Sequence, residues 1–104
     1  MTLAEETYAL TAKIARAREF DLARQMRRAA VSVPSNIAEG YARRSPTDYK
    51  RFLAIANGSV RELETQALLA VRLGLVTREE AAVVLRHCAD LGKLLTALRR
   101  SLSV

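Results

Sequence analysis

Apolar residues recur along this chain at alternating steps of three and four, the spacing that places side chains on one face of an α-helix. The most regular stripe contains Tyr49, Phe52, Ala56, Ser59, Leu63, Gln66, Ala70 and Leu73. A second contains Val84, Cys88, Leu91, Leu95, Leu98 and Leu102. Two weaker stripes contain Leu3, Thr7, Leu10, Ile14 and Ala17, and Leu22, Met26, Ala29, Val33 and Ile37. Because no segment alternates strictly between apolar and polar residues, the pattern predicts helices and no strands.

Capping residues predict where these helices begin and end. Thr2 with Glu5, and Thr77 with Glu80, have the spacing of a capping box, in which two free amides at a helix start are satisfied reciprocally. The remaining boundaries are indicated by Asp21, by Ser45 followed by Pro46, and by Gly74. Together these residues predict helices at about 2–17, 21–43, 46–73 and 77–101.

Short connections between long helices predict an all-α fold, an antiparallel up-down four-helix bundle, in one domain spanning residues 1–104. Pro34 falls inside the second helix, where its ring crowds the carbonyl of Ala30 and one backbone donor is lost. We expect a kink there, and not a break, because Ile37 continues the apolar stripe. Ser32, Ser35 and Asn36 are close enough to satisfy freed backbone groups.

Asn36 and Glu39 flank this kink and are expected to face inward. A buried Glu39 carboxylate would need an Arg partner. The small residues 57–59, Asn-Gly-Ser, indicate a close approach of the third helix to the second.

The chain is strongly basic. Its 104 residues include 17 Lys and Arg against 11 Asp and Glu, a net charge of +6, and only three of the cations are Lys. Because the planar guanidinium binds phosphate in a two-pronged geometry, an Arg-rich surface favours polyanionic partners. The alternative is that these charges are simply solvated.

Candidate chemistry is sparse. The single cysteine excludes a disulfide framework and favours a reducing compartment, so we expect a cytoplasmic protein. The opening segment is acidic and amphipathic, unlike a signal peptide, and no apolar run approaches the length of a membrane span. His87 and Cys88 are neighbours on a helix and point apart, so we expect an exposed histidine and a small core residue. We find no set of residues for catalysis, metal binding or a cofactor, and expect no enzymatic activity.

Residues 25–40, QMRRAAVSVPSNIAEG, closely resemble the four-helix-bundle proteins encoded in 23S rRNA intervening sequences. This family resemblance includes the accessory variability determinant of diversity-generating retroelements. The likeness continues through residues 44–45, 51–53, 55–59 and 62–66, and ends near 73–74. It implies a bundle that assembles as a homopentamer and binds nucleic acid through a basic surface. For a retroelement member, it also implies partnership with a reverse transcriptase.

The candidate binding residues are seven cations of the second and third helices: Arg24, Arg27, Arg28, Arg43, Arg44, Lys50 and Arg51. The first three lie about one turn apart, and the other four gather where the second helix meets the third. We expect the junction to be positive, with the first three either joining it or forming a separate patch. Contacts to phosphate would make binding to RNA or DNA largely independent of sequence.

Two other interpretations remain open at this stage. The seven cations could form a solvated face with one or two ion pairs to Glu39 or Glu62. Alternatively, the protein could be an adaptor or structural oligomer that binds an acidic protein surface and has no nucleic-acid role.

Overall fold

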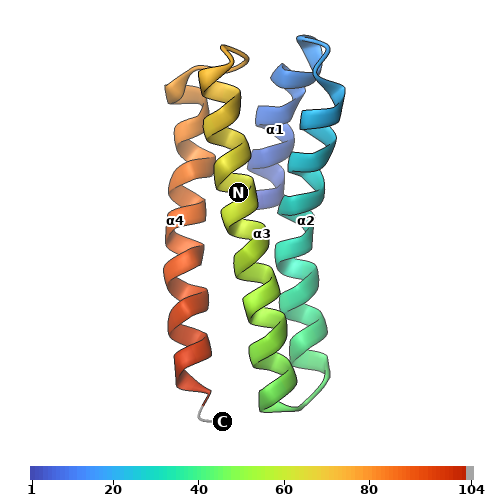
Figure 1. The fold of residues 1–104 in the computed structure, drawn as a ribbon, viewed down its shortest axis with the longest axis vertical. Helices are drawn as coiled ribbons and strands as arrows, with labels where there is room; N and C mark the ends of the chain where they lie inside the picture. The colour runs from blue at the N-terminus through green and yellow to red at the C-terminus, as the bar shows by residue number, and fades with distance from the viewer. Residues whose placement is uncertain (103–104) are drawn as a thin grey trace.

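A computed structural model describes residues 1–102 as four α-helices joined by short loops. They are α1 (Leu3–Arg16), α2 (Phe20–Ala42), α3 (Pro46–Arg72) and α4 (Arg78–Ser101). Figure 1 shows the helices side by side and alternating in direction, with α3 in front between α4 and α2 and with α1 behind. Within the described residues no strand forms, which confirms the predicted antiparallel four-helix bundle. Residues 103 and 104 of the predicted domain lie outside the described part.

The capping pattern places three of the four helix starts correctly. Both capping boxes are formed, and the Ser45 side chain accepts a hydrogen bond from the Asp48 amide. The prediction for α2 is wrong: the helix begins at Phe20, before Asp21, and no side chain caps it. Asp21 instead accepts a hydrogen bond from Gln25 within the first turn, at 3.1 Å.

Helix α2 passes through Pro34 without a break. The Asn36 side chain donates to the carbonyl oxygen of Ser32 at 2.8 Å and to the Ser32 hydroxyl at 2.9 Å. That hydroxyl in turn lies 2.8 Å from the Ser59 hydroxyl on α3. The polar residues around the proline therefore form a small network that ties α2 to α3 at mid-height.

The core lies along the bundle axis and receives side chains from every helix. Ile14, Met26, Leu53 and Cys88 are among the residues with no exposed surface. Full burial of a large apolar side chain stabilises a fold by about 1.5–3 kcal/mol, so these stripes supply the main driving force. The predicted apolar stripes are thus largely confirmed, except that Ala17 and Leu73 at their ends are exposed.

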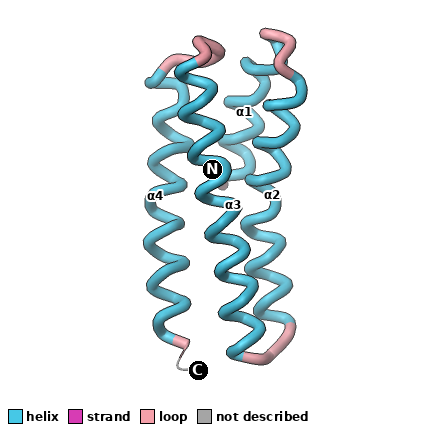
Figure 2. The backbone as a smooth tube through the Cα atoms, in the orientation of Figure 1, coloured by secondary structure: helices cyan, strands magenta, loops and turns pink. Residues whose placement is uncertain are grey.

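Helix α1 covers only part of the bundle. Its 14 residues span about 21 Å, whereas the molecule is 45 Å long. Figure 2 shows α1 beside the upper half of α2, and the chain begins at mid-height. Below it, α2 and α4 lack a fourth helix among the described residues.

One expectation about α2 is wrong, and one about α3 holds only in part. Glu39 is exposed and pairs with Arg43, because Ile37 and Gly40, not Glu39, continue the inward-facing side of α2. Within residues 57–59, Ser59 lies against Ser32 of α2 as expected, whereas Gly58 is exposed and a Cβ built on it would meet nothing within 4 Å. A second close approach of α3 to α2 occurs at Gly40, where a Cβ would lie 2.6 Å from the Cβ of Phe52.

None of the helices in residues 1–102 combines the length and the apolar character needed to cross a membrane.

Candidate nucleic-acid interface

The seven predicted cations form two separate groups on the bundle. Arg24, Arg27 and Arg28 lie in the first half of α2, whereas Arg43, Arg44, Lys50 and Arg51 surround the loop between α2 and α3. Residues 28 and 43 are separated by about 22 Å of helix. Of the two arrangements that the sequence left open, the fold therefore has the one in which Arg24, Arg27 and Arg28 form a separate patch. We call the two groups the upper patch and the junction patch.

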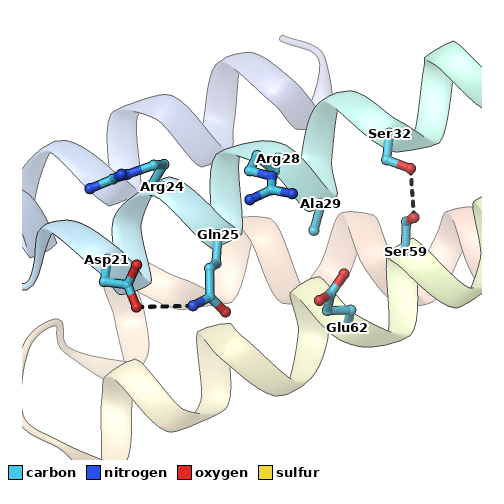
Figure 3. A pocket seen from close by; sticks show the side chains of 8 residues that line it. All are labelled: Asp21, Arg24, Gln25, Arg28, Ala29, Ser32, Ser59 and Glu62. Carbon is cyan, nitrogen blue, oxygen red and sulfur yellow. Dashed lines mark hydrogen bonds between the residues drawn. The ribbon is translucent and has the colours of Figure 1, made fainter.

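A groove of about 440 Å³ between α2 and α3 underlies the upper patch. Its lining residues, drawn in Figure 3, are Asp21, Arg24, Gln25, Arg28, Ala29, Ser32, Ser59 and Glu62. The hydroxyl pair Ser32–Ser59 closes one end of it. Arg24 and Arg28 are exposed, and neither side chain makes an ion pair or a hydrogen bond within residues 1–102. Their guanidinium groups are therefore available to a ligand.

Arg27 differs from its two neighbours. Its Nε donates to the Thr11 hydroxyl at 2.8 Å, and its Cζ lies 4.9 Å from the centre of the Tyr8 ring. Both partners belong to α1, so Arg27 is half-buried and ties α1 to α2. Two of the three predicted cations of the upper patch thus face solvent freely, and the third is mainly structural.

The junction patch is partly neutralised by its own acids. Arg43 pairs with Glu39 at 2.9 Å, and Arg51 lies 4.0 Å from Asp48. Both guanidinium groups also lie on the ring of Phe52, at 5.2 and 4.6 Å from its centre. Exposed ion pairs of this kind are weak, about 0.2–1 kcal/mol, so a phosphate could still compete for either arginine.

Arg44 is the most available cation of the junction patch. It is exposed, makes no ion pair with another described residue, and has a φ of +55°. An L-residue in this left-handed region costs roughly 1 kcal/mol compared with glycine. Lys50, on the first turns of α3, is half-buried.

A second basic groove, of about 320 Å³, lies between α3 and α4 and was not expected from the sequence. Its lining consists of Arg61, Gly92, Lys93, Thr96, Ala97 and Arg100. The three-and-four spacing of Lys93, Ala97 and Arg100 was visible in the sequence. The missing information was the rotation of α4 about its own axis, which decides whether these residues meet Arg61 of α3.

His87 and Cys88 diverge as expected, but His87 is half-buried where we expected exposure. Its Nδ1 lies 2.6 Å from a carboxylate oxygen of Glu6, which joins α4 to α1. Cys88 is a core residue, as predicted, and burial raises the pKa of its thiol to about 12. Among residues 1–102, no three His, Cys, Asp or Glu side chains gather in a way that could hold a metal ion.

Comparisons with known proteins agree with the fold. The model of the family described as 23S rRNA-intervening sequence protein matches residues 1–97. A crystal structure of a protein of unknown function from the S23 ribosomal protein family of Bacteroides thetaiotaomicron VPI-5482 superposes with a TM-score of 0.77. It is 23% identical, and the match covers 94% of this chain and 98% of that chain, so the likeness shows the fold alone. No curated protein matches.

Proposed function

Because this chain belongs to the 23S rRNA-intervening sequence protein family, we propose that it is a non-enzymatic, homo-oligomeric bundle that binds RNA or DNA. The observation that carries the proposal is that Arg24 and Arg28 line an open groove and form no ion pair with a described residue, although Asp21 and Glu62 line the same groove. Such arginines can form charge-assisted, two-pronged hydrogen bonds to phosphate oxygens. Contacts of this kind hold the backbone and do not select bases, so binding is largely independent of sequence.

The exposure of Arg44 supports the same function for the junction patch. Its side chain lies in solvent and makes no ion pair with another described residue. Its left-handed backbone does not distinguish it, because Arg18 at the end of α1 has a φ of +65°. We assign Arg44 the main phosphate contact of the junction patch because of its availability, with Arg43 and Arg51 as weaker contributors.

Self-assembly is part of the proposal because α1 leaves an apolar face uncovered. Helix α1 docks on α4 through Glu80 and His87, and the same stripe of α4 continues downward through Leu91, Leu94 and Leu98. Leu94 is 62% exposed. On α2 the stripe that meets α1 continues through Ile37 to Tyr41, which is 74% exposed. Exposed apolar patches of this kind mark interaction sites.

A second copy of the chain is the proposed occupant of that face, and a closed ring such as a homopentamer would repeat the basic patches around one axis. Several weak phosphate sites held together bind one nucleic acid far more tightly than each would alone. A reverse transcriptase as an additional partner remains a prediction from the family resemblance.

The test is RNA binding as a function of salt. We expect the affinity for a short structured RNA to fall steeply between about 50 and 200 mM salt, because bound phosphates release counterions. Replacing Arg24 and Arg28 by Gln should weaken binding and reduce the salt dependence. Replacing Arg78 and Arg86, two exposed arginines of α4 outside both grooves and the junction patch, removes the same charge and should change binding little. An affinity that is insensitive to salt would refute phosphate contact.

A second candidate function, the protein–protein adaptor, is favoured by one observation. Leu69 and Leu73, one turn apart at the end of α3, are both exposed, away from the uncovered face. If the protein is an adaptor, a partner protein from cell extract should stay bound after nuclease treatment. It should no longer bind when Leu69 and Leu73 are replaced by Gln. A nucleic-acid tether would instead be lost with nuclease.

A further inference from the structure

The groove between α3 and α4 is shaped by a glycine. Gly92 is buried, and the guanidinium of Arg61 lies across it so closely that a Cβ at residue 92 would overlap Nη2 and approach Cζ to 3.0 Å. The missing side chain lets the Arg61 head lie against α4, beside Lys93 and Arg100. The three cations therefore converge on one groove from two helices.

The charge of this groove is less compensated than that of the groove between α2 and α3. No carboxylate belongs to its lining, whereas Asp21 and Glu62 line the other groove. Glu64 pairs with Nη1 of Arg61 at 3.1 Å from outside the lining. The side chains of Lys93 and Arg100 make no ion pair or hydrogen bond within the described part of the chain.

Helix α3 separates the two grooves, which border the same turn of it. Ser59 faces α2 and bonds Ser32, while Arg61 faces α4. Gly58 lies between them on the outer crest, about 100° from Ser59 on one side and about 60° from Arg61 on the other. Figure 1 shows α3 in front, with α4 and α2 on either side of it.

Gly58 has no structural reason to lack a side chain. A Cβ there would meet nothing within 4 Å, and glycine weakens the interior of a helix. One situation that favours glycine is the close approach of a ligand to the backbone. Because Gly58 lies on the crest between two basic grooves, a ligand that connects the grooves would pass close to its backbone.

We propose that one nucleic-acid strand crosses α3 at Gly58, with phosphates held by Arg24 and Arg28 on one side and by Arg61, Lys93 and Arg100 on the other. This inference rests on the proposed function and adds a second phosphate subsite and a path between the two. The grooves are about one helix diameter apart, 10–12 Å, which a strand of a few nucleotides spans.

The test uses the full chain and single-stranded RNA of two lengths, one long enough to occupy both grooves and one that fits a single groove. We expect Lys93→Gln with Arg100→Gln to weaken binding of the long RNA at least fivefold and to flatten its salt dependence. The matched control, Arg78→Gln with Arg86→Gln on the same helix, should stay within twofold of wild type. Wild-type affinity in the Lys93 and Arg100 variant would overturn the proposal.

Gly58 provides an independent arm. Gly58→Gln should raise the thermal midpoint, because helix propensity improves, and yet weaken binding of the long RNA more than that of the short RNA. Equal loss for both lengths, or no loss, would contradict a crossing at this residue. A loss of binding in this variant cannot be attributed to unfolding if its midpoint rises.

The outcomes also separate this inference from the function on which it rests. If wild type binds no RNA, the proposed function fails. If Arg24→Gln with Arg28→Gln weakens binding but the Lys93 and Arg100 variant does not, only the second subsite fails.

Discussion

The guanidinium of Arg61 occupies the space that a side chain at Gly92 would need. This relationship joins α3 to α4 and at the same time builds a basic groove. Because the overlapping atoms belong to the far end of a flexible side chain, the arginine can move away without disturbing either backbone.

Gly92→Ala should therefore displace Arg61 without unfolding the protein. Alanine improves helix propensity by about 1 kcal/mol, and the loss of the Arg61 contacts offsets part of this gain. We expect the free energy of unfolding, measured by urea denaturation, to change by less than about 1 kcal/mol, while affinity for the long RNA falls. A stability loss well above that value would mean that Arg61 cannot leave its position.

Gly40→Ala should have the opposite effect on stability from Gly58→Ala. At residue 40 a Cβ would lie 2.6 Å from the Cβ of Phe52, an atom fixed to the backbone of α3, so the two helices must separate. We expect a loss of about 1–3 kcal/mol, the usual result of overpacking. Gly58→Ala, on open surface, should gain up to about 1 kcal/mol. Thermal and urea denaturation of both variants provide the comparison, and similar effects at both sites would contradict it.

Local sequence rules predicted the fold well because its determinants are local. The capping boxes at Thr2 and Thr77, the Ser45 cap and the left-handed Gly74 depend only on residues within one turn. At α2 the same rules failed by one residue, since its first turn begins at Phe20 without a side-chain cap.

The candidate site was predicted less well because it depends on the rotation of each helix. Glu39 was expected inside and lies outside, and Arg27, expected on the same exposed face as Arg24 and Arg28, is half-buried and donates to Thr11. The groove at Arg61 requires knowing which face of α4 meets α3. Such relations are long-range, and a single sequence does not encode them as a local pattern.

The pair Glu6–His87 should stabilise the docking of α1 on α4. Its atoms are 2.6 Å apart, and the side chains are only 15% and 31% exposed, so the pair is shielded from solvent more than the exposed pairs. A double-mutant cycle with Glu6→Gln and His87→Gln should give a coupling energy of about 1 kcal/mol or more at pH 6. The exposed pair Glu39–Arg43, treated in the same way, should give about 0.3–0.5 kcal/mol. Equal coupling in the two cycles would contradict a special role for the pair.

Cys88 should be unreactive in the folded protein. Its side chain has no exposed surface, and burial raises the pKa of the thiol from the ordinary 9.0 to about 12. Alkylation by iodoacetamide at pH 8 should therefore follow global unfolding and accelerate in urea. Rapid alkylation of native protein would contradict this.

The raised pKa of Cys88 also predicts how stability depends on alkaline pH. Because the folded pKa lies above the unfolded one, the contribution is fully present below about pH 9 and is lost as the pH rises towards 12. The comparison is with Cys88→Ala, which removes the thiol and leaves every other ionisable group in place. We expect the free energy of unfolding to fall more steeply above pH 9 in wild type than in the variant, and parallel curves would refute the link.

The uncovered face below α1 should determine assembly. Leu94 projects from the stripe of α4 that contacts α1 higher up, and it is 62% exposed. Leu94→Arg places a charge at the proposed contact between copies, where it would be desolvated without a partner. We expect the mass measured by light scattering to fall to that of a monomer, with unchanged helicity. The control Leu68→Arg makes the same change on an exposed leucine of α3 and should leave the mass unchanged. Because assembly repeats the basic patches, the Leu94 variant should also bind long RNA more weakly than the control. An oligomer that stays intact in Leu94→Arg would mean that the copies contact each other elsewhere.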